Sequence, residues 1–149
     1  MDKVKSIKIS IVITAVFLGL LAVFVAALPW MVSWYVEKMG RSQSLAATVL
    51  ITCYPCAPFV AAALLFLRKL LKNVLKIGLL NEVNFALMKK IIFCCFIIAF
   101  ITLIAGNFYM PFFIVSATFM FVALLLFGLR AALYVTVKEN EETEETLEN

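Results

Sequence analysis

The chain contains no histidine, and only 15% of its 149 residues are charged. The absence of histidine excludes a histidine general base and a histidine-ligated metal site. No Asp or Glu interrupts the long apolar stretches either, whereas proton and ion pathways through a membrane usually need an ionisable group at depth. We therefore expect no enzymatic reaction, no metal ion and no cofactor.

Apolar side chains take the place of the missing charge: 65% of the residues are hydrophobic, and the mean hydropathy is +1.09. A soluble domain is about 45–50% apolar and about 25% charged. A water-soluble fold of this length cannot bury so much apolar surface, so we expect lipid to surround most of the chain. Direct nucleic-acid binding is disfavoured, because the basic residues flank the apolar stretches without zinc-ligand spacing or a recognition-helix pattern.

Four apolar stretches are long enough to cross a bilayer, which takes roughly 20 helical residues for ~30 Å of hydrocarbon. Strands are excluded, because open sheet edges are unstable in lipid and no alternating pattern indicates a barrel. The sequence therefore predicts an all-α integral membrane four-helix bundle over residues 1–138. Its expected spans are at about 9–35, 44–67, 88–108 and 111–135.

A basic segment with Lys3, Lys5 and Lys8 precedes the first stretch, as it does in signal peptides. The apolar region of a signal peptide is about 7–15 residues long, whereas this stretch is far longer and ends near Trp30 and Trp34. Tryptophans at this position are typical of a membrane interface. We expect the segment to be retained as the first span.

Eleven of the thirteen Lys and Arg residues fall on one side of the predicted membrane, and only Lys38 and Arg41 fall on the other. The eleven lie in the N-terminal tail, in the connection between the second and third spans, and at the C-terminal end. An excess of this kind marks the cytoplasmic face. We expect both termini to be cytoplasmic.

The central connection, residues 68–90, is basic and amphipathic. Gly78 interrupts its helical pattern, and Asn81 or Asn84 can cap the helix that follows. Two interpretations remain open. The bases anchor two helix extensions to anionic headgroups, at ~1 kcal/mol each near the surface, or they form a docking platform for a cytosolic partner or the chain's own tail. The basic residues are Arg68, Lys69, Lys72, Lys76, Lys89 and Lys90.

Residues 139–149 form an acidic tail with no basic residue after Lys138. Such runs usually stay disordered and solvated, and this is the predicted state. The alternative is a weak, salt-sensitive latch in which the tail lies against the basic connection.

Cys53 and Cys56 form a C-x-x-C pair in the second span, a spacing that can cycle through a disulfide. The layout resembles that of quinone-linked membrane oxidases, but those enzymes need a second pair in an outer loop. Here Cys94 and Cys95 belong to the cytoplasmic half of the third span. Buried cysteine is mostly a small apolar side chain, so thiol chemistry is kept as an alternative.

Six hydroxyl residues within the spans are candidates for hydrogen bonds between helices, which are common in membrane proteins. They are Thr14, Thr48, Thr52, Thr102, Ser116 and Thr118.

The central segment "FLRKLLKNVLKIGLLNEVNFALMKKIIFCC" resembles the middle of a family of small bacterial four-helix membrane proteins of unknown function. That family often has an aromatic residue where Leu80 stands, and it ends in a short acidic-then-apolar tail, which only Glu139-Asn140 matches here. Its genes often lie beside one for a small helix-turn-helix regulator. The shared positions are Leu70-Leu71-Lys72-Asn73-Val74, Gly78, Leu80, Asn81 and Asn84.

The resemblance implies a multi-pass protein of the bacterial plasma (inner) membrane that is a partner of a regulator. We expect a non-enzymatic regulatory or accessory subunit that presents its basic connection to a cytosolic regulator, to another membrane protein or to anionic lipid. The alternatives are a thiol-disulfide oxidoreductase that uses Cys53 and Cys56, and a small transport or peptide-immunity protein. A homo-oligomer is compatible with all three.

Overall fold

The computed structural model describes residues 2–78 and 80–149, and it is helical throughout apart from three short turns and the last residue of the chain. Each of its four helices is long enough and apolar enough to cross a membrane. The prediction of an all-α, four-helix protein is therefore confirmed. The helices are α1 (Asp2–Met39), α2 (Gln43–Ile77), α3 (Glu82–Gly106) and α4 (Pro111–Glu148).

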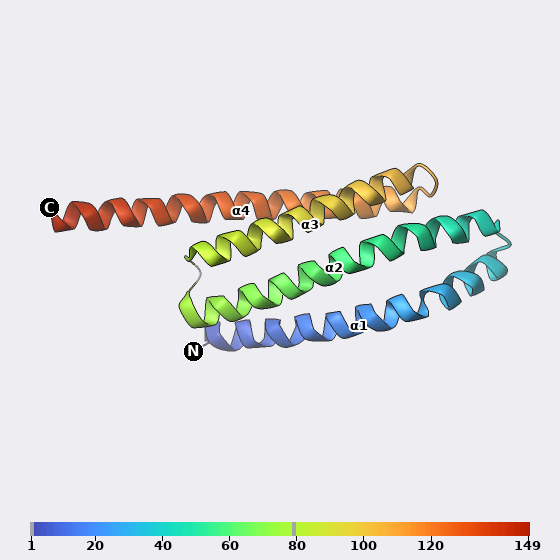
Figure 1. The fold of residues 1–149 in the computed structure, drawn as a ribbon, viewed down its shortest axis with the longest axis horizontal. Coiled ribbons are helices and arrows are strands. Elements are labelled where there is room, and N and C mark those ends of the chain that lie inside the picture. The colour runs from blue at the N-terminus through green and yellow to red at the C-terminus, as the bar shows by residue number, and fades with distance from the viewer. Residues whose placement is uncertain (1, 79) are drawn as a thin grey trace.

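The helices run up and down beside one another in chain order (Figure 1). Both termini and the α2–α3 turn lie at one end, which we call the terminal end, and the other two turns lie at the opposite, loop end. α1 packs on α2, α2 on α3, and α3 on α4. Within the described residues, α1 and α4 share no contact, although they would meet in a closed bundle. The four helices therefore form an open row in which apolar side chains stay exposed. Val23 of α1 and Phe121 of α4 are both more than 60% exposed.

α3 is the most buried helix, with half of its apolar segment inside the protein against 11% in each of the other three. Ile91 and Cys95 of α3 meet Ala123 of α4, while Phe66 and Leu70 of α2 pack against the same cluster. Ala123 has no exposed surface. A side chain this small allows two helix backbones to approach closely, which is how apolar helices associate when lipid is as apolar as their side chains.

One hydroxyl joins two helices directly. The Ser116 hydroxyl of α4 donates to the Ala99 carbonyl oxygen of α3 at 2.8 Å, in a buried position. The prediction of hydrogen bonds between helices is right for Ser116 and wrong for the threonines, each of which donates to the carbonyl four residues earlier in its own helix. That carbonyl is always within reach of a helical threonine, so no partner helix is needed. These residues are Thr14, Thr48, Thr52, Thr102 and Thr118.

The α3–α4 turn at the loop end is tied back to α1. Tyr109, in this turn, and Tyr35, near the end of α1, line the same cavity. Interaction with the Tyr35 hydroxyl is the main cause that raises the pKa of Tyr109 above its ordinary value, and reduced hydration adds to the shift. The Tyr109 ring also meets the Phe112 ring edge to face, at 5.7 Å between centroids. The contact with Tyr35 brings the α3–α4 turn beside the end of α1, although α1 packs on neither α3 nor α4 in the described residues.

The helices are longer than the predicted spans, and the largest difference is at the C-terminus. The sequence predicts a disordered tail over residues 139–149, whereas the structure continues α4 through Glu148. Glutamate is a good helix former, and Lys138 Nζ lies 4.0 Å from Glu142 Oε1 one helical turn away. In Figure 1 this end of α4 projects beyond the other helices. The alternative of a latch folded onto the basic connection is therefore not what the structure has.

The third helix contains most of the predicted membrane span of 88–108 and extends past its N-terminal end. α3 begins six residues earlier, at Glu82, and ends at Gly106. A Cβ atom at Gly106 would lie 3.0 Å from the Phe113 ring of α4. The end of α3 thus packs closely against the first turns of α4, which leaves only a short turn between them.

Removing the Ser116 hydroxyl should weaken the α3–α4 contact. We expect Ser116→Ala to lower the free energy of unfolding by about 0.6 kcal/mol, the average for a hydrogen bond between membrane helices. Thr118→Ala is the matched control, because the exposed Thr118 hydroxyl bonds only its own helix. Reversible unfolding in mixed detergent micelles measures both values. Equal losses in the two variants would contradict the role given to Ser116.

Candidate functional site

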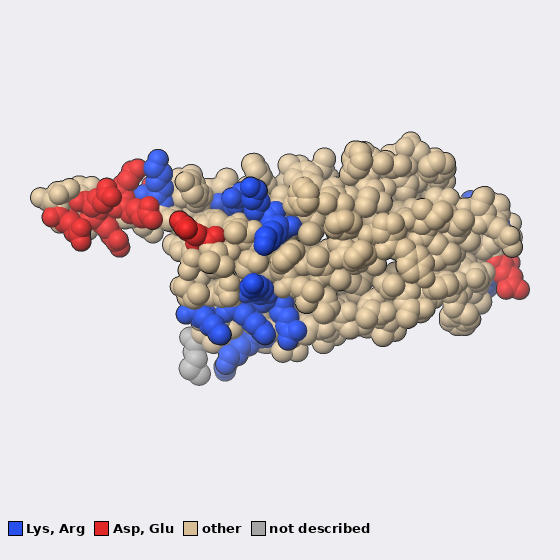
Figure 2. Space-filling view, in the orientation of Figure 1, with Lys and Arg blue, Asp and Glu red and all other residues tan. Residues whose placement is uncertain are grey.

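Basic side chains gather at the terminal end. Figure 2 shows Lys and Arg over the ends of the helices there, with a small acidic patch beside them and an acidic tip on α4. Most of the chain's thirteen basic residues belong to this end, and six of them belong to the connection between α2 and α3. We call these six the basic surface. They are Arg68, Lys69, Lys72, Lys76, Lys89 and Lys90.

α2 positions four of the six. It continues without a break to Ile77, ten residues beyond the end of its predicted span. Lys69, Lys72 and Lys76 are exposed, and their spacing places them along one side of the helix. Leu70, on another side, packs into the core. The amphipathic pattern in the sequence therefore corresponds to one face in the core and one in solvent.

The turn after α2 depends on Gly78. Its φ of 94° and ψ of 171° belong to a region that essentially only glycine adopts. Its backbone N–H donates to the Val74 carbonyl oxygen at 3.2 Å, which closes the last turn of the helix. The sequence prediction that Gly78 ends this helix is confirmed.

Asn81 and Asn84 stand at the start of α3 and form different hydrogen bonds. Asn81 is the N-cap, and its side-chain oxygen accepts a hydrogen bond from the Val83 N–H at 3.2 Å. Asn84 is buried, and its side-chain Nδ2 donates to the Gly78 carbonyl oxygen at 2.8 Å. Because Asn84 bonds across the turn, the first turn of α3 is fastened to the end of α2. Leu80, which precedes Asn81, is 46% exposed.

Lys89 and Lys90 project from α3, two turns into the helix. Lys90 Nζ lies 5.6 Å from the centre of the Phe66 ring of α2, a cation–π contact between the two helices. The α2 and α3 parts of the basic surface thus belong to one framework, which the turn and this contact hold together.

The basic surface is not neutralised by the chain itself. Within residues 2–78 and 80–149, the salt bridge formed is Lys138–Glu142, and no carboxylate lies within 4.0 Å of the six basic side chains. The Nε atom of Arg68 is buried and has no hydrogen-bond partner in the same part of the chain. The surface can therefore receive a negatively charged ligand without first breaking an internal ion pair.

The cysteines are all free thiols. Cys53 is half-buried and Cys56 buried, one turn apart on α2, while Cys94 and Cys95 are buried on α3. Among the residues that the structure describes, no three His, Cys, Asp or Glu side chains are grouped so that they could hold a metal ion. Redox chemistry at Cys53 and Cys56 stays a prediction.

Gly78 should be intolerant of any side chain. We expect Gly78→Ala to lower the free energy of unfolding by about 1–3 kcal/mol, because a Cβ atom strains the backbone at this φ and ψ. Gly128→Ala is the control: Gly128 is helical with open space around its Cα, so alanine there should be neutral or stabilising by up to about 1 kcal/mol. Unfolding in mixed micelles compares them. A tolerated alanine at position 78 would contradict the turn geometry.

Comparisons of this chain with family models, with curated proteins and with solved structures found no match.

Proposed function

We propose that the chain is a multi-pass protein of the bacterial inner membrane, with both termini in the cytoplasm. The unequal distribution of basic residues supports this placement, since the terminal end has far more of them than the loop end. At the loop end, Trp30 and Trp34 are 75% and 55% exposed, and Lys38 Nζ lies 4.6 Å from the centre of the Trp34 ring. Amphipathic rings and a lysine at this position suit the opposite headgroup layer.

In this membrane the protein is a non-enzymatic regulatory or accessory subunit, and its basic surface docks an acidic cytosolic partner. One observation supports this most directly: α2 continues as a helix past its apolar span and presents Lys69, Lys72 and Lys76 to solvent, and no carboxylate in residues 2–78 and 80–149 is paired to them. A helix holds these charges at fixed spacing, so a partner with carboxylates at matching spacing gains several contacts without ordering a loop.

The chemistry of such a surface defines the partner it suits. An exposed ion pair contributes about 0.2–1 kcal/mol, so three or four pairs add up to a moderate interaction. The charges act mainly by steering an acidic surface to the membrane and fixing its orientation. Screening shortens their range to about 8 Å at physiological ionic strength, and the interaction should therefore weaken as salt rises.

The placement predicts which turns face the cytoplasm. A topology reporter inserted at Asn73, near the end of α2, should report the cytoplasm, and one at Asn107, in the α3–α4 turn, should report the opposite side. Alkaline phosphatase and a fluorescent protein are suitable paired reporters, since each is active on one side only. A fusion after Lys138 should agree with Asn73. Asn73 and Asn107 in the same compartment would overturn the topology.

If the basic surface docks an acidic partner, reversing the charge of lysines on α2 should prevent the docking. In nanodiscs of zwitterionic lipid, the wild-type protein should capture a specific protein from cytosolic extract, and Lys72→Glu with Lys76→Glu should abolish that capture, because carboxylates repel an acidic partner. Lys38→Glu with Arg41→Glu makes the same charge change at the loop end and should capture normally. Quantitative mass spectrometry reads both. A set of captured proteins that is unchanged by the α2 variant would rule out the role.

A further inference from the structure

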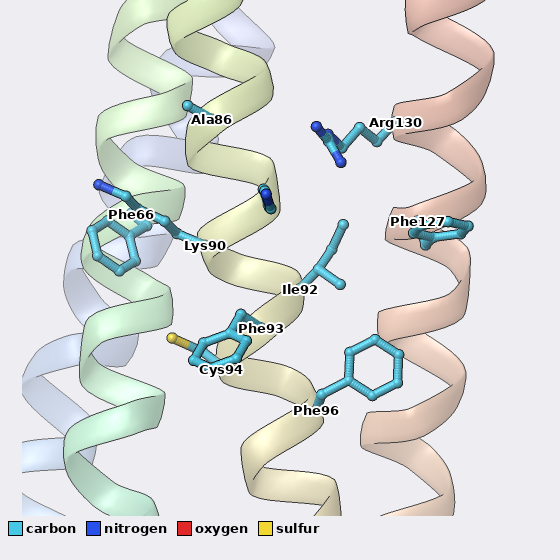
Figure 3. Close-up of a pocket in the computed structure, with 10 residues that line it drawn as sticks. Phe66, Ala86, Lys90, Ile92, Phe93, Cys94, Phe96, Phe127 and Arg130 are labelled. Atoms are coloured by element: carbon cyan, nitrogen blue, oxygen red, sulfur yellow. The ribbon is translucent and has the colours of Figure 1, made fainter.

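An apolar groove of about 630 Å³ crosses α2, α3 and α4 near the terminal end. Figure 3 shows its aromatic lining, with Phe66 from α2, Phe93 and Phe96 from α3, and Phe127 from α4. Phe93 and Phe127 are 65% and 57% exposed, so the groove opens to the surroundings of the protein rather than into its core. Its walls can accept a long apolar chain lying along the helices.

Three cations line the same groove, and none of its lining residues is acidic. They are Lys89 and Lys90 of α3 and Arg130 of α4. In Figure 3 the Arg130 side chain reaches from α4 toward α3, and Lys90 reaches toward Phe66. The cations lie on the side of Ala86, while Phe93 and Phe96 lie farther along α3. The groove is thus charged at one end and apolar along the rest of its length.

Arg130 lacks a partner for one of its donors. Its Nε atom is buried and forms no hydrogen bond within the described residues. A guanidinium group binds phosphate oxygens in a fixed fork geometry, and its hydrogen bonds strengthen where water is excluded. A phosphate at this end of the groove would therefore bind the guanidinium group of Arg130, and the two lysines would add charge.

The position of the cations fits the depth of a phospholipid headgroup. Arg130 lies nineteen residues after Pro111, the first residue of α4, which is roughly 28 Å along a helix axis at 1.5 Å per residue. The hydrocarbon layer is ~30 Å thick. On α3, the long apolar run begins immediately after Lys90. Both helices therefore place their cations at the same boundary of the apolar layer.

We propose that this groove is a binding site for one anionic phospholipid of the cytoplasmic leaflet. Its phosphate lies between Arg130, Lys90 and Lys89, and an acyl chain runs along the aromatic side chains of α3 and α4. Charge complementarity selects this occupant, because none of the described residues that line the groove is acidic and an amphiphile has its charge at one end, as the groove does. The site rests on the proposed membrane placement, but it does not rest on the docking of a cytosolic protein.

Quenching by brominated lipid tests the site in a bilayer. In a Trp30→Phe/Trp34→Phe background, a single Phe127→Trp substitution places the fluorophore in the groove, and Leu125→Trp is the matched control. Leu125 is equally exposed, at 57%, two residues away on a different side of α4, and it does not line the groove. Brominated phosphatidylglycerol is compared with brominated phosphatidylcholine, and the ratio of quenching gives the relative affinity at each probe.

The probe at position 127 should prefer phosphatidylglycerol by about fivefold or more, the effect of a single surface cation, and the control at 125 should show almost no preference. Lys90→Gln with Arg130→Gln should remove the preference at position 127. Lys72→Gln with Lys76→Gln removes the same amount of charge outside the groove. The preference at position 127 should persist in this variant. Equal preference at the two probes, or a preference that survives the loss of Lys90 and Arg130, would overturn the site.

A second measurement uses the wild-type sequence and so avoids any effect of the probes on folding. Protein released from nanodiscs that contain equal amounts of phosphatidylglycerol and phosphatidylcholine should retain one phosphatidylglycerol in native mass spectrometry. Ala86→Trp fills the groove beside the cations without changing the charge, and it should release this lipid. Retention of both lipids alike, or retention of phosphatidylglycerol by the Ala86→Trp variant, would equally overturn the proposal.

Discussion

A helix does not end where its side chains change from apolar to charged, and this property sets the position of the basic surface. After Pro55 and Pro58, which lack a backbone N–H, α2 continues as a helix from the apolar segment into the segment with Lys69, Lys72 and Lys76, up to Gly78. Backbone hydrogen bonds within a helix are satisfied in lipid and in water alike. The apolar segment fixes the axis of the helix, and the axis fixes where each cation stands. A flexible connection of the same composition would leave the charges without defined spacing.

The same constraint explains why the packing depends on small residues and on few polar contacts. When lipid surrounds a helix, burying an apolar side chain against another helix gains little, so close approach and hydrogen bonds must hold the helices together. α3 has both: Ala123 lets α4 come near, and Ser116 donates to Ala99. α1 packs on α2 alone. At the loop end its Tyr35 also lies beside Tyr109 of the α3–α4 turn.

Much of this architecture could be predicted from the sequence, because each feature depends on residues that are near one another in the chain. The four helices follow from long apolar runs, and the break at Gly78 follows from a residue that alone tolerates the required backbone angles. The helix over the tail residues has a cause of the same kind. A run of glutamates has low hydrophobicity, which indicates disorder, but it also has high helix propensity next to a helix that is already formed.

The groove lined by Lys89, Lys90 and Arg130 could not be predicted in that way, because Arg130 is forty residues from Lys90 and its part in the site depends on which face of α4 meets α3. The charges on the two surfaces also act in different surroundings. Lys72 and Lys76 stand in water, where salt screens their attraction for an acidic partner, whereas the Nε atom of Arg130 is buried and is screened much less. A lipid that neutralises Lys89 and Lys90 leaves the lysines of α2 free, since they do not line the groove. The α2–α3 turn therefore separates the exposed lysines of α2 from the cations of the groove, so the proposed lipid and the proposed soluble partner would occupy different surfaces.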